Sequence, residues 1–271
     1  MPELPEVETI RLGLEPLITG KTVQRIITRT PKLRVPLEPR KLNHLQGKTL
    51  VRIERRGKYL LFVFSTNWLL VHLGMSGTLV YLPQATPHQV HDHVDLCFTD
   101  GSLVRLHDPR RFGLILFFAQ DPLMSPPLAH CGPEPLSAQM NGAYLFQASR
   151  NRHVAIKNFL LDQKVIAGLG NIYVNEALFL AHIYPEREAC RIGLEQYEAL
   201  AASIRAVLRH ALEAGGTTLR DYRNAEGKPG YFAVQLQVYG RAGQPCPQCG
   251  AKVQVDRIGQ RSTFFCRHCQ K

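Results

Sequence analysis

Four cysteines near the end of the chain restrict its fold more than any other feature. They form two Cys-x-x-Cys pairs, Cys246 with Cys249 and Cys266 with Cys269. Each pair can hold one side of a tetrahedral ion, and the segment between the pairs suits a two-stranded ribbon. His268 lies within the second pair and could compete as a metal ligand, but four thiolates are sufficient to complete the site. The pattern therefore predicts one structural Zn²⁺, and a disulfide interpretation is weak if thiols stay reduced.

The total charge points to a polyanionic partner. The chain has 271 residues, which favours about two domains, and a formal net charge of +11. Such a basic excess favours nucleic acid, although a merely soluble basic protein would have the same total. No apolar run reaches the roughly 20 residues of a membrane span. Acidic residues stand where a signal peptide has its basic region, so we expect a cytoplasmic protein without a membrane partner.

Apolar periodicity divides the chain into a strand-rich part and a helical part. A helix is expected over residues 7–17, ended by Gly20, and short strands over residues 22–118 with hairpin turns at 65–67 and 100–101. This pattern predicts a β-sandwich or barrel preceded by one helix. The complete fold class is therefore α+β.

The domain boundaries follow from composition. Prolines concentrated between residues 121 and 135 indicate a linker. We expect domains at 1–121 and 141–242, a linker at 122–140 and the ribbon at 243–271. Within the second domain the spacing predicts four helices, near residues 141–149, 153–162, 172–182 and 194–214. A charged glycine-containing loop is expected near 220–230, and a strand-like run near 232–239.

The first residues, Met-Pro-Glu-Leu-Pro-Glu, allow two interpretations. Glu3 and Glu6 share one helix face, and Pro5 suits a first helical turn, so this is an ordinary helix start. Alternatively, removal of Met1 would give Pro2 a free secondary amine. Such an amine can attack an electrophilic carbon and form an iminium ion. Its reference pKa of about 7.7–8.0 leaves more of it neutral than a lysine would have.

Two basic stretches are candidates for contact with a duplex backbone. The Gly-Leu-Gly turn before Asn171 opens a helix, where backbone amides can approach a phosphate. Arg150, Arg152 and Lys157 precede this turn and complete a candidate clamp. A glycine turn alone is weak support. Arg261, at the expected turn of the ribbon, is either a groove-reaching side chain or a solvated surface arginine.

Two glycine-flanked loops carry apolar residues. Met75 lies in Gly-Met-Ser-Gly, and Phe112 in the loop of residues 108–113. These side chains either fold back onto the core or act as wedges that hold a duplex kinked while a nucleotide is extruded. In the second case Arg110 would fill the vacated space.

Lys58 and a group of three histidines each allow a functional and an ordinary interpretation. Lys58 follows a glycine, and either binds a phosphate or is a solvated turn lysine. The histidines His88, His91 and His93 match no compact metal motif, so an exposed hairpin loop is favoured there.

Together these motifs resemble formamidopyrimidine-DNA glycosylase, a bacterial family of repair enzymes for oxidised purines. The resemblance runs in order from Pro2 to Lys271. Leu4, where the related endonuclease VIII group has glycine, favours the formamidopyrimidine branch. The resemblance implies an N-terminal β-sandwich with a leading helix, a helix-two-turns-helix domain and a zinc ribbon, with DNA between the domains.

The resemblance also implies residue roles. Pro2 would attack C1′ of the damaged nucleotide, and Glu3 would assist sugar-ring opening. Glu6 would support the site from the same helix face. Residues 219–231 would form a mobile lid. The remaining matched positions would be phosphate ligands at Lys58, Asn171 and Arg261 (Lys58 and Arg261 within the catalytic set), further DNA contacts at His91, Arg110, Arg152 and Lys157, and a base-stack wedge at Met75, Arg110 and Phe112.

The expected activity is a bifunctional glycosylase and lyase. It would excise 8-oxoguanine and formamidopyrimidines from damaged double-stranded DNA and cut the strand by β,δ-elimination. The expected cofactor is one structural Zn²⁺ without a nucleotide cofactor, and the expected form is a monomer associated with the bacterial nucleoid. Two alternatives remain: an oxidised-pyrimidine glycosylase of the endonuclease VIII type, and a non-catalytic damage-binding protein.

Overall fold

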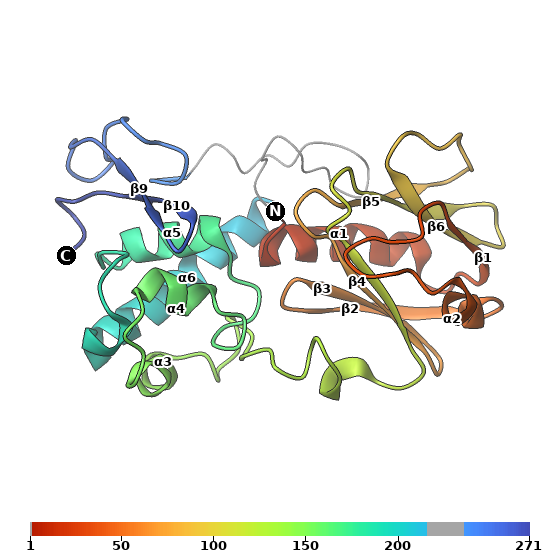
Figure 1. Ribbon diagram of the computed structural model, residues 1–271, viewed down its shortest axis with the longest axis horizontal. Coiled ribbons are helices and arrows are strands. Elements are labelled where there is room, and N and C mark those ends of the chain that lie inside the picture. Colours follow the sequence, from red (N-terminus) through yellow and green to blue (C-terminus); the bar gives the residue numbers. More distant parts are fainter. Residues whose placement is uncertain (1, 216–235) are drawn as a thin grey trace. The chain divides into compact units, whose positions relative to one another are not determined.

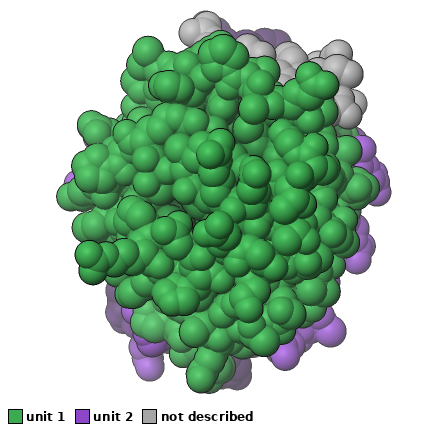
Figure 2. All heavy atoms as spheres, turned by 90° about the vertical axis from the view of Figure 1, so that its right-hand side faces the viewer, with its two compact units in different colours: residues 1–129, 214–232 green, residues 130–213, 233–271 purple. Residues whose placement is uncertain are grey.

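The computed structural model describes residues 2–215 and 236–271, which form two compact units. Within those ranges, unit 1 holds residues 2–129 and 214–215, and unit 2 holds residues 130–213 and 236–271 (Figure 2). None of the described helices is both long and apolar enough to cross a membrane. The predicted lid at residues 219–231 lies outside the described residues.

Unit 1 is a β-sandwich with a leading helix, as the sequence predicted (Figure 1). Two antiparallel four-stranded sheets form it. The first sheet has, in spatial order, β1 (Val23–Thr28), β6 (Asp92–Phe98), β7 (Leu103–His107) and β5 (Thr78–Leu82). The second has β2 (Leu50–Arg56), β3 (Tyr59–Phe64), β4 (Trp68–His72) and β8 (Leu114–Phe118). The helical segments are α1 (Leu4–Ile18), α2 (Pro39–Leu42), η1 (Asn43–Leu45) and η2 (Pro122–Met124).

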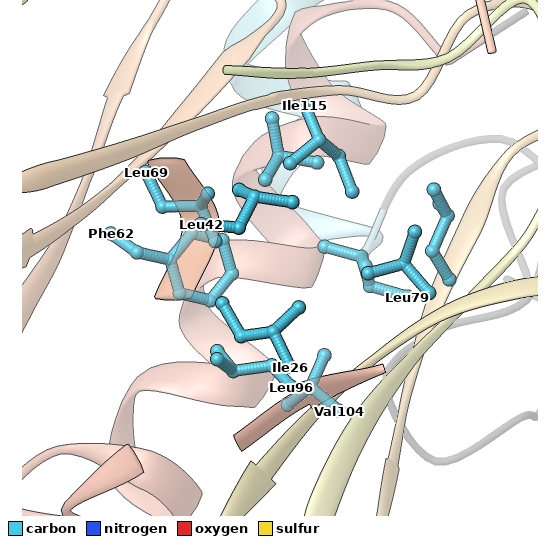
Figure 3. A pocket seen from close by; sticks show the side chains of 11 residues that line it. Ile26, Leu42, Phe62, Leu69, Leu79, Leu96, Val104 and Ile115 are labelled. Atoms are coloured by element: carbon cyan, nitrogen blue, oxygen red, sulfur yellow. The ribbon is translucent and has the colours of Figure 1, made fainter. Parts of the chain in front are cut away.

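The core of unit 1 lies between its two sheets. Helix α1 contributes one face, on which Val7, Ile10, Leu14 and Ile18 are buried at helical spacing. Side chains of both sheets and of α2 converge around a small, wholly apolar cavity (Figure 3). Burial of this alternating apolar set stabilises the sandwich, and it leaves the polar loops at the strand ends to carry chemistry.

Part of the expected linker packs against unit 1. Leu128 is buried in a cluster with Leu61, Val63 and Leu70, on strands β3 and β4. The prolines therefore do not make residues 122–128 an extended spacer, since η2 and this apolar contact hold them to the sheet.

Unit 2 contains the four expected helices, each within a few residues of its predicted bounds. They are α3 (Gly142–Ser149), α4 (Ile156–Leu161), α5 (Asn171–Leu180) and α6 (Leu194–Glu213), with η3 (Ala189–Arg191) before α6. The hairpin of β9 (Gln254–Ile258) and β10 (Arg261–Phe265) follows. Gln163 joins the two turns before α5, since its side chain accepts from Gly168 N at 2.8 Å and donates to Leu169 O at 2.9 Å.

The predicted strand over residues 232–239 is wrong in its described part, because residues 236–239 form bends and a turn. Their backbone amides do not pair with a strand. The N–H groups of Gln237, Val238 and Tyr239 instead donate to the carboxylate of Glu176 on α5, at 2.8, 3.0 and 2.8 Å. A buried side chain far away in sequence thus replaces the sheet ladder that the apolar alternation suggested.

Candidate active site and DNA-contact residues

The N-terminal segment combines both of the interpretations that the sequence allowed. Glu3 is the N-cap residue of α1, and a reciprocal capping box joins it to Glu6. The backbone N–H of Glu3 donates to Oε2 of Glu6 at 2.8 Å. Pro2, Glu3 and Glu6 are all buried. An ordinary helix start therefore holds two carboxylates beside the residue that would carry the terminal amine.

Glu8 holds this helix against the sheet. Its carboxylate accepts from Arg55 Nε on β2 at 2.8 Å and from Arg11 Nη2 at 2.8 Å. Burial opposes ionisation of Glu8, but the guanidinium groups of Arg11 and Arg55 outweigh it and lower the pKa of this carboxyl. Glu8 therefore orients α1, and with it the N-terminal residues.

Lys58 is buried at the turn between β2 and β3, so it is not a solvated turn lysine. Gly57, with φ of 56°, makes that turn. Strand β4 places His72 opposite Tyr59, next to Lys58 in the chain. Burial, together with the charges of Lys58 and Arg34, lowers the pKa of His72 to about 4. The imidazole is therefore neutral near pH 7, and its Nδ1 accepts from Gly74 N at 3.0 Å.

The two loops proposed as wedges are in direct contact. A Cβ at Gly74, where φ is +64°, would lie 2.4 Å from the carbonyl carbon of Phe112. Asp108 joins the loops further, because it accepts from Ser76 Oγ at 3.0 Å and from Gly113 N at 2.7 Å. Only glycine at position 74 lets the backbones approach this closely.

The apolar side chains of these loops face solvent. Met75 is 41% exposed and Phe112 is 44% exposed, so the interpretation in which they fold back onto the core is wrong. The guanidinium carbon of Arg110 lies 5.0 Å from the centre of the Phe112 ring. The loops thus present two apolar groups and one stacked cation at one place on unit 1.

His91 is exposed in the turn immediately before β6, with φ of 75°. Its ring lies 6.2 Å from that of His93 and 6.0 Å from that of His107. The neighbouring carboxylate of Asp92 is occupied by His107 Nδ1 at 2.8 Å. No group of metal-ligating side chains in the described residues includes these histidines.

In unit 2, the turn between β9 and β10 brings Arg261 to the end of α4. Gly259 and Gln260 have φ of 57° and 60°, as a two-residue type I′ hairpin turn requires. A Cβ at Gly259 would lie 2.2 Å from Oδ1 of Asn158, so the turn is packed tightly on α4. Arg261 is exposed and pairs with Ile258 across the hairpin.

Lys157 is buried behind this hairpin. Its Nζ donates to Thr263 Oγ1 at 2.7 Å and to Ser262 O at 2.9 Å, and lies 3.4 Å from Arg261 O. Burial and the charge of Arg261 lower the pKa of Lys157 to about 8. The sequence suggested a DNA contact for Lys157, whereas the structure gives its ammonium three partners within the protein.

Asn171 begins α5 and reaches the same carbonyl. Its Nδ2 donates to Ser262 O at 3.0 Å, while its buried Oδ1 has no hydrogen-bond partner within the described structure. Lys157, Asn171 and Arg261 are therefore gathered at one end of the hairpin. Arg152 is exposed nearby in the chain, 3.7 Å from Asp162.

Arg150, in contrast, has a structural position. It stacks on Phe146 at 3.8 Å and donates to Phe146 O and Ile192 O, both at 2.9 Å. Of Arg150, Arg152 and Lys157, which the sequence suggested as a clamp, Arg152 is the exposed one.

The four cysteines of the ribbon converge as the sequence predicted. All four sulfur atoms lie within 4.8 Å of one another. Cys246 and Cys269 are 3.9 Å apart, and Cys249 and Cys266 are 3.5 Å apart. A tetrahedral Zn²⁺ with Zn–S bonds of about 2.3 Å needs sulfur separations of about 3.8 Å. The cluster fits one structural zinc ion, which would hold the ribbon together.

Sequence reasoning missed His72, Asp108 and Glu176. Each accepts hydrogen bonds from backbone N–H groups, which the residue types of a motif do not reveal. The available signals were positional: His72 immediately precedes the Gly-Met-Ser-Gly loop, and Asp108 opens the other one.

Three family models match the chain. They are the formamidopyrimidine-DNA glycosylase N-terminal domain at residues 1–115, the H2TH domain of the same enzymes at 131–223, and the zinc finger found in FPG and IleRS at 243–271. The chain belongs to the formamidopyrimidine-DNA glycosylase family. Members of this family are characterised as DNA glycosylases with an associated AP lyase activity.

Curated family members match over their whole length. Formamidopyrimidine-DNA glycosylases of Yersinia enterocolitica and Nitrosococcus oceani are 51% and 47% identical over 270 residues, with full coverage of both chains. Among solved structures, a Lactococcus lactis FPG mutant with Fapy-dG-containing DNA has a TM-score of 0.92, 37% identity and full coverage of both chains. MutM (FPG) from Thermus thermophilus has a TM-score of 0.88 and 39% identity, and covers 99% of this chain and 98% of that one.

Proposed function

We propose that this chain excises oxidised purines from duplex DNA and cuts the strand at the resulting abasic site, with Pro2 as the nucleophile. Family membership supports the reaction class. The observation that carries the residue assignment is the buried start of α1, where the Glu3 amide donates to Glu6. It holds Glu3 and the residue before it in one position.

The reaction follows from a free Pro2 amine. After removal of Met1, the neutral nitrogen attacks C1′ and the damaged base departs with the electrons of the glycosidic bond. Opening of the sugar ring, assisted by a proton from Glu3, gives an iminium ion between Pro2 and C1′. The iminium acidifies the C2′ proton. Its loss expels the 3′ phosphate by β-elimination, and δ-elimination then expels the 5′ phosphate. Water later releases the sugar fragment and regenerates the amine.

The remaining predicted residues bind the duplex in this proposal. Arg261, Asn171 and Lys58 bind phosphates around the lesion, and Arg152 and His91 extend the contact. Lys157 acts through the hairpin, since its ammonium is occupied by the backbone beside Arg261. Met75, Arg110 and Phe112 enter the base stack, because both apolar side chains are exposed and the guanidinium is stacked beside them.

Borohydride trapping on a duplex that contains 8-oxoguanine tests the assignment. We expect a reduced covalent adduct that peptide mass spectrometry places on Pro2. The control is the same protein with an uncleaved extension before Pro2, which should bind the duplex without forming an adduct. An adduct on a lysine, or none with the processed protein, would overturn the proposal.

A competition assay tests the substrate class. Oxidised purines should be excised faster than oxidised pyrimidines placed in the same duplex. The reverse ranking would indicate the endonuclease VIII type of activity instead. Binding without excision by the processed protein would indicate a damage-binding protein.

The proposal extends to assembly and location. We infer that the protein acts on nucleoid DNA in a bacterial cytoplasm, since the named relatives are bacterial. We further propose that it acts as a monomer. Sedimentation with a lesion duplex should give a complex of one chain per duplex, and a dimeric complex would refute the monomer.

A further inference from the structure

A second group of metal-ligating side chains lies in unit 2, outside the zinc ribbon. It consists of His153, Glu188 and Cys190, whose ligand atoms all lie within 4.8 Å of one another. The proposed glycosylase chemistry uses none of them. His153 Nδ1 is 3.4 Å from Glu188 Oε2 and 3.5 Å from Cys190 Sγ, and this sulfur is 3.6 Å from the same carboxylate oxygen.

These three separations match one face of a tetrahedral metal site. In a tetrahedral site, metal bonds of about 2.0–2.1 Å to nitrogen and oxygen place these two ligand atoms about 3.3–3.4 Å apart. A metal–sulfur bond of about 2.3 Å places the sulfur about 3.5–3.6 Å from each of them. We propose that His153, Glu188 and Cys190 form a second metal site, which binds one divalent transition-metal ion of the Zn²⁺ type.

The backbone prepares this arrangement without a metal. Three hydrogen bonds join the segment of residues 152–156 to residues 187–190. They are Cys190 N to Arg152 O at 3.1 Å, Ala189 N to Val154 O at 2.9 Å, and Ile156 N to Arg187 O at 2.7 Å. Because both segments are already paired, metal binding does not have to order them, which lowers its entropic cost.

The donor set determines the class of ion. Imidazole nitrogen and thiolate sulfur favour zinc-like ions, whereas Mg²⁺ and Ca²⁺ take oxygen ligands. A thiolate and a carboxylate together balance the charge of a divalent ion. Three protein ligands leave a fourth position for water, so this ion would exchange more readily than one bound by four cysteines.

Arg191 is the competitor for this site. Its Nε lies 3.0 Å from Oε2 of Glu188, the oxygen nearest to the other two ligands. The side chain of Arg191 is 73% exposed, and that of His153 is 79% exposed. Since an exposed ion pair contributes little free energy, a metal ion can displace the guanidinium. Replacement of Arg191 by glutamine should therefore strengthen metal binding.

Cobalt titration of the full-length protein with its ribbon already filled with zinc tests the proposal. We expect one further equivalent of Co²⁺ to bind, with the thiolate-to-cobalt charge-transfer absorption that a cysteine ligand produces. Zinc release, followed in parallel with an indicator, should stay at zero because the ribbon site is not exchanged. The measurement needs no DNA, so its result is independent of the glycosylase assignment.

Variants distinguish this site from adventitious surface binding. Cys190→Ser should abolish the charge-transfer band, and His153→Ala should weaken binding by about tenfold or more. His88→Ala, which removes an exposed histidine of unit 1, should leave the titration unchanged. A holoprotein that binds no further equivalent, or a band that persists in Cys190→Ser, would overturn the proposal.

Discussion

Lys157 and Asn171 donate to the same acceptor, the carbonyl oxygen of Ser262, from 2.9 and 3.0 Å. One residue lies on α4 and the other begins α5, so both helices of the glycine-turn motif hold the residue next to Arg261. The positions that sequence motifs suggested as separate phosphate contacts are therefore one connected group. Within it, Arg261 is the exposed basic member and Lys157 is its buried support.

Replacing Lys157 by methionine should impair the hairpin. The change keeps the aliphatic stem and removes the donors to Ser262 and Thr263, which should lower the free energy of unfolding by about 1–3 kcal/mol. Displacement of Arg261 should also weaken binding to a lesion duplex by about tenfold, or about 1.4 kcal/mol. Urea denaturation and a binding titration measure the two effects. Lys164→Met, at an exposed lysine of the same unit, should change neither by more than about 0.5 kcal/mol.

Gly74→Ala should separate the two loops that carry Met75 and Phe112. The new Cβ would meet the Phe112 backbone at 2.4 Å, so the loops must move apart and base excision should fall strongly. The free energy of unfolding should fall by about 3 kcal/mol or more. Gly101→Ala is the matched control, because its φ is +87° but nothing lies within 4 Å of the added carbon. It should cost only about 1–2 kcal/mol of strain and retain activity. Equal losses of excision in both variants would contradict the prediction.

His72 should make the protein sensitive to mild acid. Its pKa is lowered from 6.5 to about 4 in the folded chain. Between these values the unfolded chain binds a proton that the native chain does not, so stability falls as the pH decreases through that window. His72→Asn keeps an acceptor for Gly74 N and removes the titration. Compared with wild type, it should lose less stability between pH 7 and pH 4 in urea denaturation. His88→Asn should retain the wild-type pH dependence.

Glu176→Gln should loosen residues 237–239. The amide offers one acceptor oxygen in place of two, and its NH₂ group would face a backbone donor. The loss should be about 1–3 kcal/mol in the free energy of unfolding. Hydrogen exchange of the Gln237 to Tyr239 amides should become faster. Glu186→Gln, at an exposed carboxylate, should leave the exchange rates of these amides unchanged.

Local patterns were sufficient to predict most of the fold. The buried face of α1, the hairpin turns and the four helices follow from periodicity and glycine placement. The predicted strand failed over its described residues, 236–239, because Glu176, far away in sequence, takes the amides that a strand would pair. No periodicity reports a contact of this kind. Strands β5 and β8 were not predicted individually; each begins directly after a glycine, Gly77 and Gly113.

The candidate site was predictable as a set of residues but not as an arrangement. Motifs indicated Pro2, Glu3, Met75 and Phe112 as candidates, because the chemistry they could perform is visible in the residue types. The burial of Lys157 was not predictable, because it depends on the hairpin of residues 254–265 packing on α4. The supporting residues His72 and Asp108 act on backbone groups, which leave no pattern in the sequence.

The two-residue turn at Gly259 and Gln260 limits the insertions and deletions that the β9–β10 hairpin can accept. Side chains alternate between the faces of a strand, and Arg261 shares its face with the buried residue Thr263. One residue inserted into the turn or deleted from it would leave Arg261 facing away from α4 and the Ser262 carbonyl out of reach of Lys157. The turn should therefore tolerate substitutions that keep a positive φ far better than any insertion or deletion.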